Sequence, residues 1–135
     1  MTQRVDNIKQ VGVLQDFGTP FSSLFINLEN KALYLFVKIN SYDLKNPEYA
    51  VTNVTATEIE KYMDDSLGLN DIFRDKTSFI AVISDNNILI KENRNNKRIL
   101  FNDSLNHFDS DFCEDDVWLE TFLQRIKNNK PLEIA

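Results

Sequence analysis

The stretch 103–120 holds the residues whose types and spacing are best suited to chemistry. It reads DSLNHFDSDFCEDDVWLE and contains seven acidic residues, no Lys or Arg, and the chain's only His, Cys and Trp. Carboxylates, imidazoles and thiols are the usual metal ligands and acid–base catalysts. The stretch therefore suggests a metal site, a catalytic site, a mimic of nucleic acid, or simply the start of a helix.

The spacing of these groups argues against a resident metal. A calcium loop beginning at Asp109 departs from the required pattern at Cys113 and Glu114, which stand where an oxygen ligand and a glycine are needed. Asp109 and Asp111 suit magnesium, but such a pair is common by chance. Zinc needs several Cys or His ligands, and His107 and Cys113 are the only ones present. We expect no metal and no cofactor.

Catalytic motifs are also absent from the sequence. It contains no G-x-S-x-G, no P-loop and no G-x-G-x-x-G. The adjacent pairs Asp64–Asp65 and Asp115–Asp116 would point to different sides of a helix, so neither forms an acid–base dyad. The sequence therefore nominates no catalytic residue.

A helix N-terminus explains most of the acidic stretch. The acids at 114–116 fall in the first turn of a helix predicted over 112–129, where negative charge is favourable, and Asp111 has capping-box-like spacing. Asp103 and Asp109 are not explained in this way. We therefore define a candidate interaction face that consists of Asp103, Asp109, Asp111, Asp115 and Asp116. If it binds a partner, neutralising Asp109, Asp115 and Asp116 should slow association.

Length and composition indicate one globular domain over 1–135. The chain is 42% hydrophobic and 27% charged, with a net charge of −6. Outside 103–120 it has 14 acids and 15 bases, so the acidity is local. No apolar run approaches the roughly 20 residues that span a membrane, and the polar start predicts no secretory signal. We expect a cytoplasmic protein.

Apolar periodicity predicts an α+β fold. It has an antiparallel sheet of about six or seven strands, a short helical pair at 57–75 and a longer C-terminal helix. Thr57 and Glu60 have the spacing of a capping box, and Asn70 suits the cap of the second short helix. The predicted strands are 11–17, 22–28, 32–39, 49–55, 77–84, 88–92 and 97–101, of which the last three form a meander.

Two further expectations follow from apolar patterns. Strands 32–39 and 79–83 are apolar on both faces, while the predicted helices offer limited cover, so we expect a homodimer that buries the remainder. Trp118 lies at the centre of the last helix's apolar stripe and should anchor that helix on the sheet, so Trp118→Ala should cost about 3–5 kcal/mol.

Positive charge is concentrated at one predicted hairpin. It holds Lys91, Arg94, Lys97 and Arg98, without interleaved aromatic residues. This pattern is more typical of a solvated hairpin tip than of a phosphate-binding surface. We expect no direct binding of nucleic acid.

Two stretches carry a resemblance to known proteins. One is VGVLQDFGTPFSSLFINLENKALYLFVKI at 11–39, and the other is TATEIEKYMDDSLGLNDIFRD at 55–75. Together they resemble a family of small bacterial and phage domains known only as a domain of unknown function. The resemblance covers about half of the chain and excludes the acidic stretch. It implies an α+β fold and carries no active site.

Three functional hypotheses remain open from the sequence. The leading one is a non-enzymatic interaction domain, such as a regulator, inhibitor or immunity-type protein, that binds a protein partner. The second is a domain that binds a small molecule or nucleotide, with or without hydrolytic activity, in a pocket that sequence does not reveal. The third is an acidic mimic of nucleic acid that occupies a basic groove.

Overall fold

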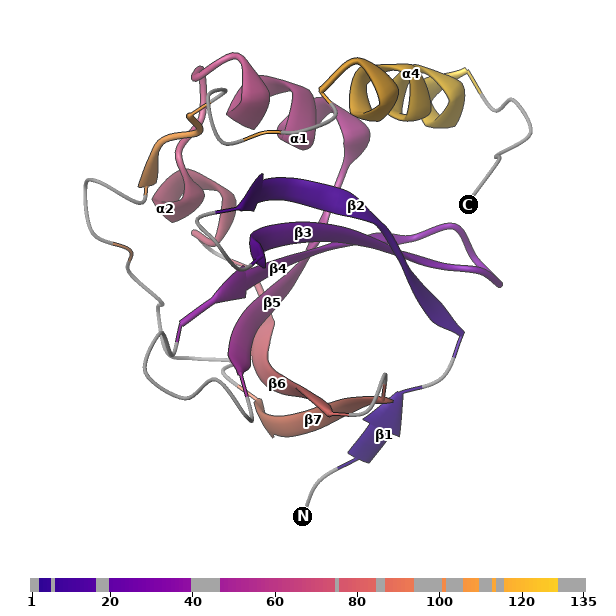
Figure 1. Ribbon diagram of the computed structural model, residues 1–135, viewed down its shortest axis with the longest axis vertical. Helices are drawn as coiled ribbons and strands as arrows, with labels where there is room; N and C mark the ends of the chain where they lie inside the picture. The colour runs from indigo at the N-terminus through magenta and orange to yellow at the C-terminus, as the bar shows by residue number, and fades with distance from the viewer. Residues whose placement is uncertain are drawn as a thin grey trace.

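The computed structural model shows an α+β fold with seven antiparallel strands in one sheet and helices on one side of it (Figure 1). The sequence-based prediction of the fold class is thereby confirmed. None of the helices in the described part of the chain is long and apolar enough to cross a membrane. The structure describes residues 3–5, 7–16, 20–39, 47–74, 76–84, 87–93, 101, 106–109, 113 and 116–128.

The sheet has the strand order β1-β7-β6-β5-β4-β3-β2. Consecutive strands from β2 to β7 are neighbours, so most of the sheet is a simple meander. The strands are β1 (Gln3–Val5), β2 (Ile8–Asp16), β3 (Pro20–Asn27), β4 (Leu33–Lys38), β5 (Glu48–Val54), β6 (Ser78–Ser84) and β7 (Asn87–Asn93). The helices are α1 (Ala56–Met63), α2 (Leu69–Ile72) and α4 (Asp116–Lys127).

The sheet is strongly curled (Figure 1), and the strands at its two ends, β1 and β2, are consecutive in the chain. β1 pairs with β7 and β2 pairs with β3, yet β1 ends at Val5 and β2 begins at Ile8. Figure 1 shows the strands as an incomplete ring. At the bend, Asn7 has φ 67°, a left-handed conformation that Asn tolerates, and its carbonyl oxygen accepts a hydrogen bond from the Leu28 N–H. The bend lets one short N-terminal segment complete both edges of the sheet.

The curled sheet separates two hydrophobic clusters. On β4, Leu33, Leu35 and Val37 belong to the cluster under the helices, whereas Phe36 belongs to the cluster inside the curl. This alternation is the one predicted from the sequence of β4. The inner cluster contains buried Phe25, Phe36, Tyr49, Val51, Ala81 and Ile88, with Val5, Ile8, Tyr34, Phe79 and Ile83 packed against them.

The inner cluster changes the argument for a homodimer. That prediction assumed that the second apolar faces of 32–39 and 79–83 lack cover within one chain. Every strand from β1 to β7 contributes to the inner cluster, so the sheet covers this face itself. Homodimerisation stays a prediction, but uncovered strand faces no longer support it.

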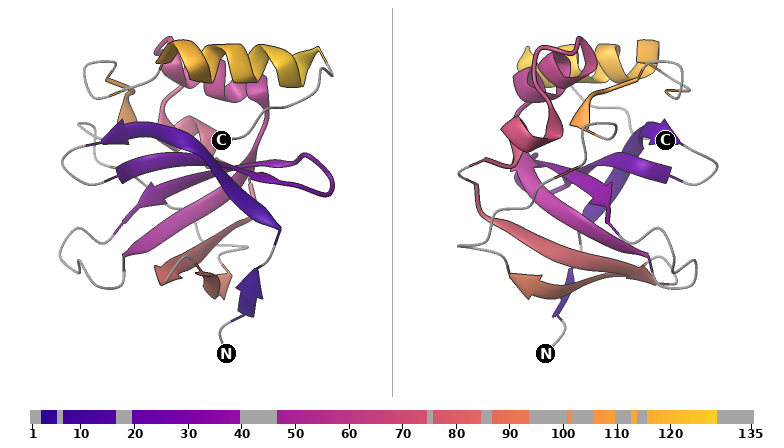
Figure 2. Two further views of the ribbon diagram at one scale, coloured as in Figure 1. Left: turned by 45° about the vertical axis from the view of Figure 1, so that its right-hand side comes forward. Right: turned by 90° about the vertical axis from the view of Figure 1, so that its left-hand side faces the viewer.

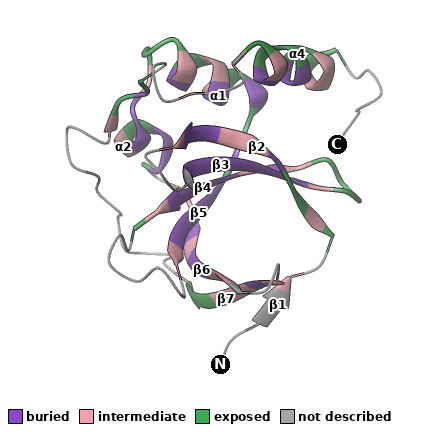
Figure 3. Cartoon of the chain, viewed as in Figure 1, coloured by how far each residue is buried: buried purple, intermediate pink, exposed green. Residues whose placement is uncertain are grey.

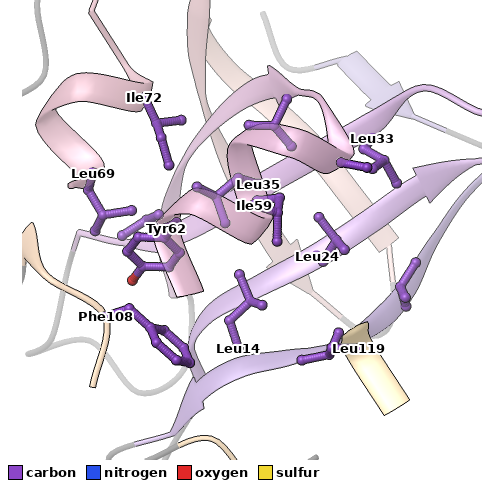
Figure 4. Packing of buried hydrophobic residues seen from close by; sticks show 14 of the residues in the cluster. Leu14, Leu24, Leu33, Leu35, Ile59, Tyr62, Leu69, Ile72, Phe108 and Leu119 are labelled. Carbon is purple, nitrogen blue, oxygen red and sulfur yellow. The ribbon is translucent and has the colours of Figure 1, made fainter. Parts of the chain in front are cut away.

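The helices cover the outer face of the sheet (Figures 2 and 3). Figure 4 shows Ile59 and Tyr62 of α1 and Ile72 of α2 directed at Leu24 and Leu35 of the sheet. All five side chains are completely buried. Their burial supplies the main stabilisation of the short helices, because helices of this length are marginal by themselves.

Helix α4 packs over β2 through Leu119, Phe122 and Leu123, which are at most 2% exposed. A Cβ at Gly12 of β2 would lie 3.3 Å from Leu119 Cδ2, so glycine permits this close approach. Trp118 is partly buried at the margin of the contact and stacks on Phe122, with ring centroids 5.6 Å apart. The apolar stripe of α4 is therefore centred on Leu119 and Leu123, not on Trp118 as the sequence predicted.

The first helix begins earlier than the sequence suggested. Thr55, not Thr57, is its N-cap: Thr55 Oγ1 accepts from the Glu58 N–H, and Glu58 Oε1 accepts from the Thr55 N–H. Glu58 also binds Lys76, with 2.6 Å between Lys76 Nζ and Glu58 Oε2. The capping box predicted at Thr57 and Glu60 is wrong because the same Thr-x-x-Glu spacing occurs two residues earlier, where β5 ends.

We expect Thr55→Ala to lower the free energy of unfolding by about 0.5–2 kcal/mol, the usual cost of losing an N-cap. Thr57→Ala is the matched control and should change stability by less than about 0.5 kcal/mol, because Thr57 is exposed within the helix. Urea denaturation of the two variants measures both values. Equal costs would contradict the assignment of the cap.

The second helix also starts differently. Its N-cap is Gly68, and Asp71 Oδ2 accepts a hydrogen bond from the Gly68 N–H. Asn70, predicted as the cap, instead bonds both the N–H and the carbonyl of Phe101, at 2.7 and 3.1 Å. Asn106 Oδ1 accepts from the Asn70 N–H at 2.7 Å. The side chain of Asn70 therefore forms hydrogen bonds with a residue distant in sequence, not with the N-terminus of its own helix.

The predicted third strand of the C-terminal meander, 97–101, is described only at its last residue. Phe101 is not in a strand and packs on Phe73, with ring centroids 5.1 Å apart, while 97–100 lie outside the described residues. The edge of β7 that this strand would take is paired with β1 over 88–90. The prediction missed β1 because a polar three-residue strand carries no periodic signal.

Candidate functional site

A groove lies between α1 and α4, which lie side by side over the sheet (Figure 2). Its volume is about 540 Å³, within the range of about 300–1,000 Å³ typical of ligand sites. The groove is lined by Glu60, Met63, Asp64, Glu120, Thr121 and Gln124.

The amphipathic character of the two helices positions this lining. On α1, Ile59 and Tyr62 point into the core, which turns Glu60 toward the outer surface. On α4, Leu119 and Leu123 point into the core. The next residues, Glu120 and Gln124, are therefore exposed on the outer surface. Figure 3 shows the result as buried inner faces and exposed outer faces. The groove therefore lies where the polar faces of the two helices meet.

Three carboxylates make the groove acidic. Glu60 is contacted from α4: Lys127 Nζ lies 3.2 Å from Glu60 Oε2, and Gln124 Nε2 lies 3.5 Å from Glu60 Oε1. Glu120 is exposed and has no ion-pair partner within the described ranges. Hydrogen bonds from Ser66 hold the pKa of Asp64 below its usual value, so Asp64 is ionised at neutral pH.

A smaller depression adjoins the groove on α4. It has a volume of about 130 Å³ and is lined by Trp118, Thr121, Phe122 and Arg125. Thr121 also lines the larger groove, so the two features form one continuous surface. This surface combines an aromatic pair, a methionine and charged groups, a composition common at protein interfaces.

A second polar group of interest is buried beneath α1. Tyr62 Oη donates to Gln15 Oε1 at 2.6 Å, and Gln15 faces Ser22 across the β2–β3 pair. Phe108 packs edge-on against Tyr62, with ring centroids 5.3 Å apart. Burial raises the pKa of Tyr62 well above its usual value. The raised pKa keeps the Tyr62 hydroxyl protonated, so that it can donate to Gln15.

The predicted interaction face falls mostly outside the described residues. Asp109 is described and exposed, and Asp116 is the first residue of α4, although its side chain is not described. Asp103, Asp111 and Asp115 lie outside the described ranges. The structure therefore leaves the convergence of these five acids as a prediction.

The other residues that the sequence analysis singled out, where they are described, form ion pairs or pack against the core. His107 Nδ1 lies 2.9 Å from Asp65 Oδ1, and both side chains are 60% exposed. Cys113 is partly buried against the outer cluster. Lys91 forms an ion pair with Glu48, while Arg94, Lys97 and Arg98 are outside the described ranges. Within the part of the chain that the structure describes, no three His, Cys, Asp or Glu side chains are placed to hold a metal ion.

The groove was missed by sequence reasoning although a signal was present. Glu60 and the C-cap residue Asp64 are four residues apart at the end of α1. Glu120 and Gln124 are four residues apart on α4, and residues at this spacing share a helical face. The prediction considered Glu60 only as part of a cap and Asp64 only as a neighbour of Asp65, not as residues that share a polar helical face. The sequence did not indicate that the two polar faces would be neighbours.

Comparison with protein-family models, curated proteins and solved structures yields no match for this chain. The resemblance of 11–39 and 55–75 to a domain family of unknown function stays a prediction. Function must therefore be argued from the groove itself.

Proposed function

We propose that this protein is a non-enzymatic interaction domain of the regulator, inhibitor or immunity type, and that it binds a protein partner through the α1–α4 groove. The observation that carries the proposal is the groove itself, an open hollow whose lining comes from the outer faces of two helices. An accessible, mixed polar and apolar lining that comes from two helices suits recognition of a protein surface.

The charge of the lining disfavours one alternative, the binding of a nucleotide. A nucleotide would bring phosphates close to Glu60, Asp64 and Glu120, which repel them. Mimicry of nucleic acid also requires a protein partner with a basic surface, so it is a special case of the same interaction. A cytoplasmic location, a homodimer and the acidic face at 103–116 remain predictions that accompany this proposal.

The test is to fill the groove without changing its charge. Thr121→Tyr places a large side chain at an exposed position of the lining, and Thr57→Tyr makes the same change at an exposed position of α1 outside it. We expect wild type and Thr57→Tyr to retain a common protein from an extract of the source organism. Thr121→Tyr should weaken the dissociation constant for that protein by about tenfold or more.

Circular dichroism and thermal melting establish that both variants are folded. A protein that binds wild type and Thr121→Tyr with equal affinity would place the interface elsewhere. Isothermal titration calorimetry with the purified partner gives the affinities.

A further inference from the structure

The lining of the groove contains one apolar contact point among its carboxylates. Met63 of α1 is partly buried against the outer cluster and lines the groove together with Glu60 and Glu120. Lysine and arginine pack their aliphatic stems on apolar surface while their charged heads contact carboxylates. A methionine flanked by acidic groups therefore matches the two parts of a long basic side chain.

The two helices supply carboxylates from both sides. Glu60 comes from α1, Asp64 is the C-cap residue of that helix, and Glu120 comes from α4. A cationic segment that lies between the helices gains from all three, whereas an anionic segment is repelled by them. Charge complementarity thus selects a basic occupant over an acidic or phosphorylated one.

One cation of the chain itself already contacts this site. Lys127 reaches across from the last turn of α4 to Glu60, where the two side chains are 38% and 28% exposed. Exposed ion pairs of this kind add little to stability. Exchange of Lys127 for a cation from another protein therefore costs the fold little.

On the basis of the proposed function, we infer that the groove binds a lysine- or arginine-bearing segment of the partner, and that Lys127 competes with this segment for Glu60. The partner's basic side chain packs its stem on Met63 and places its charged head between Glu60 and Glu120. Lys127 is displaced toward solvent when the segment binds. The unbound protein thus carries an internal competitor that lowers the affinity for basic segments.

The first experiment uses a short fluorescein-labelled peptide of alternating arginine and alanine, followed by fluorescence anisotropy at low and physiological salt. Glu120→Gln should weaken binding by about two- to fivefold, the range expected for one exposed charge pair. The control is Glu29→Gln, which removes the same charge in the β3–β4 turn outside the groove lining. Equal weakening by both variants would show attraction by net charge alone and overturn the inference.

The second experiment tests the competition. Lys127→Met should strengthen peptide binding by about two- to fivefold, because it frees Glu60. Lys9→Met is the control, since Lys9 is exposed on β2 and its loss changes the net charge equally. If Lys127→Met strengthens binding no more than Lys9→Met does, Lys127 is not a competitor.

The outcomes distinguish this inference from the proposed function. If Glu120→Gln leaves peptide binding unchanged while Thr121→Tyr still abolishes capture of a protein partner, the groove is an interface but its occupant is not basic. If Thr121→Tyr keeps its partner while Glu120→Gln weakens the peptide, the groove binds cations but is not the partner's site.

Discussion

Replacing Phe36 with alanine should lower the free energy of unfolding by about 3–5 kcal/mol, the range for truncating a buried aromatic side chain. Phe36 is 0% exposed at the centre of the inner cluster. It stacks on Phe25, with ring centroids 4.1 Å apart and an interplanar angle of 29°. Its ring centroid lies 6.1 Å from that of Tyr49. Alanine would leave a cavity enclosed by strands on several sides, where little relaxation is available.

Urea denaturation followed by circular dichroism measures this effect. Phe36→Leu is the matched control, because it keeps part of the side-chain volume and should cost less than Phe36→Ala. A change below about 0.5 kcal/mol in Phe36→Ala, as at surface positions, would show that the inside of the curled sheet is not a packed core.

Leu123→Ala should destabilise the protein by about 2–5 kcal/mol, because Leu123 is 0% exposed where α4 packs on the sheet. Trp118→Ala should cost less than the 3–5 kcal/mol expected from the sequence for a fully buried tryptophan, since the structure places Trp118 at the margin of this contact. Val117 is 71% exposed, so Val117→Ala should change stability by less than about 0.5 kcal/mol.

The order of the three costs is the informative quantity. Denaturant midpoints measured under identical conditions give this order directly, provided that the slopes of the transitions agree. A greater loss in Trp118→Ala than in Leu123→Ala would make Trp118 the anchor of α4. It would also remove Trp118 from the surface that adjoins the groove.

The carboxylates of the groove are not those that the acidic stretch suggested, apart from Glu120. The sequence drew attention to 103–120 because its acids are clustered there without any Lys or Arg. Four of the five residues in the predicted face lack described side chains. The groove instead takes its carboxylates from two helices that are more than 50 residues apart in the chain, α1 and α4. Sequence periodicity shows which side of each helix is polar, but not which other helix it faces.

By itself, the sequence determined most of the strands, the main helices and the faces of the central strands. The alternation of Leu33, Leu35 and Val37 with Tyr34 and Phe36 predicted a strand buried on both sides, and the structure confirms it. Local patterns suffice here because side chains alternate across a strand regardless of what covers them. The same reasoning placed α1 and α4 to within a few residues.

Only the tertiary structure decided what covers each face and which polar groups meet. β1 pairs with β7, and the curled sheet encloses Phe36 in its inner cluster. Asn70, which the sequence predicted as a local helix cap, instead forms hydrogen bonds with the distant residues Asn106 and Phe101. The α1–α4 groove arises in the same way, when Leu119 and Leu123 fix α4 over β2 beside α1. These contacts join residues distant in sequence, and their geometry depends on the packing of the whole core rather than on any local pattern.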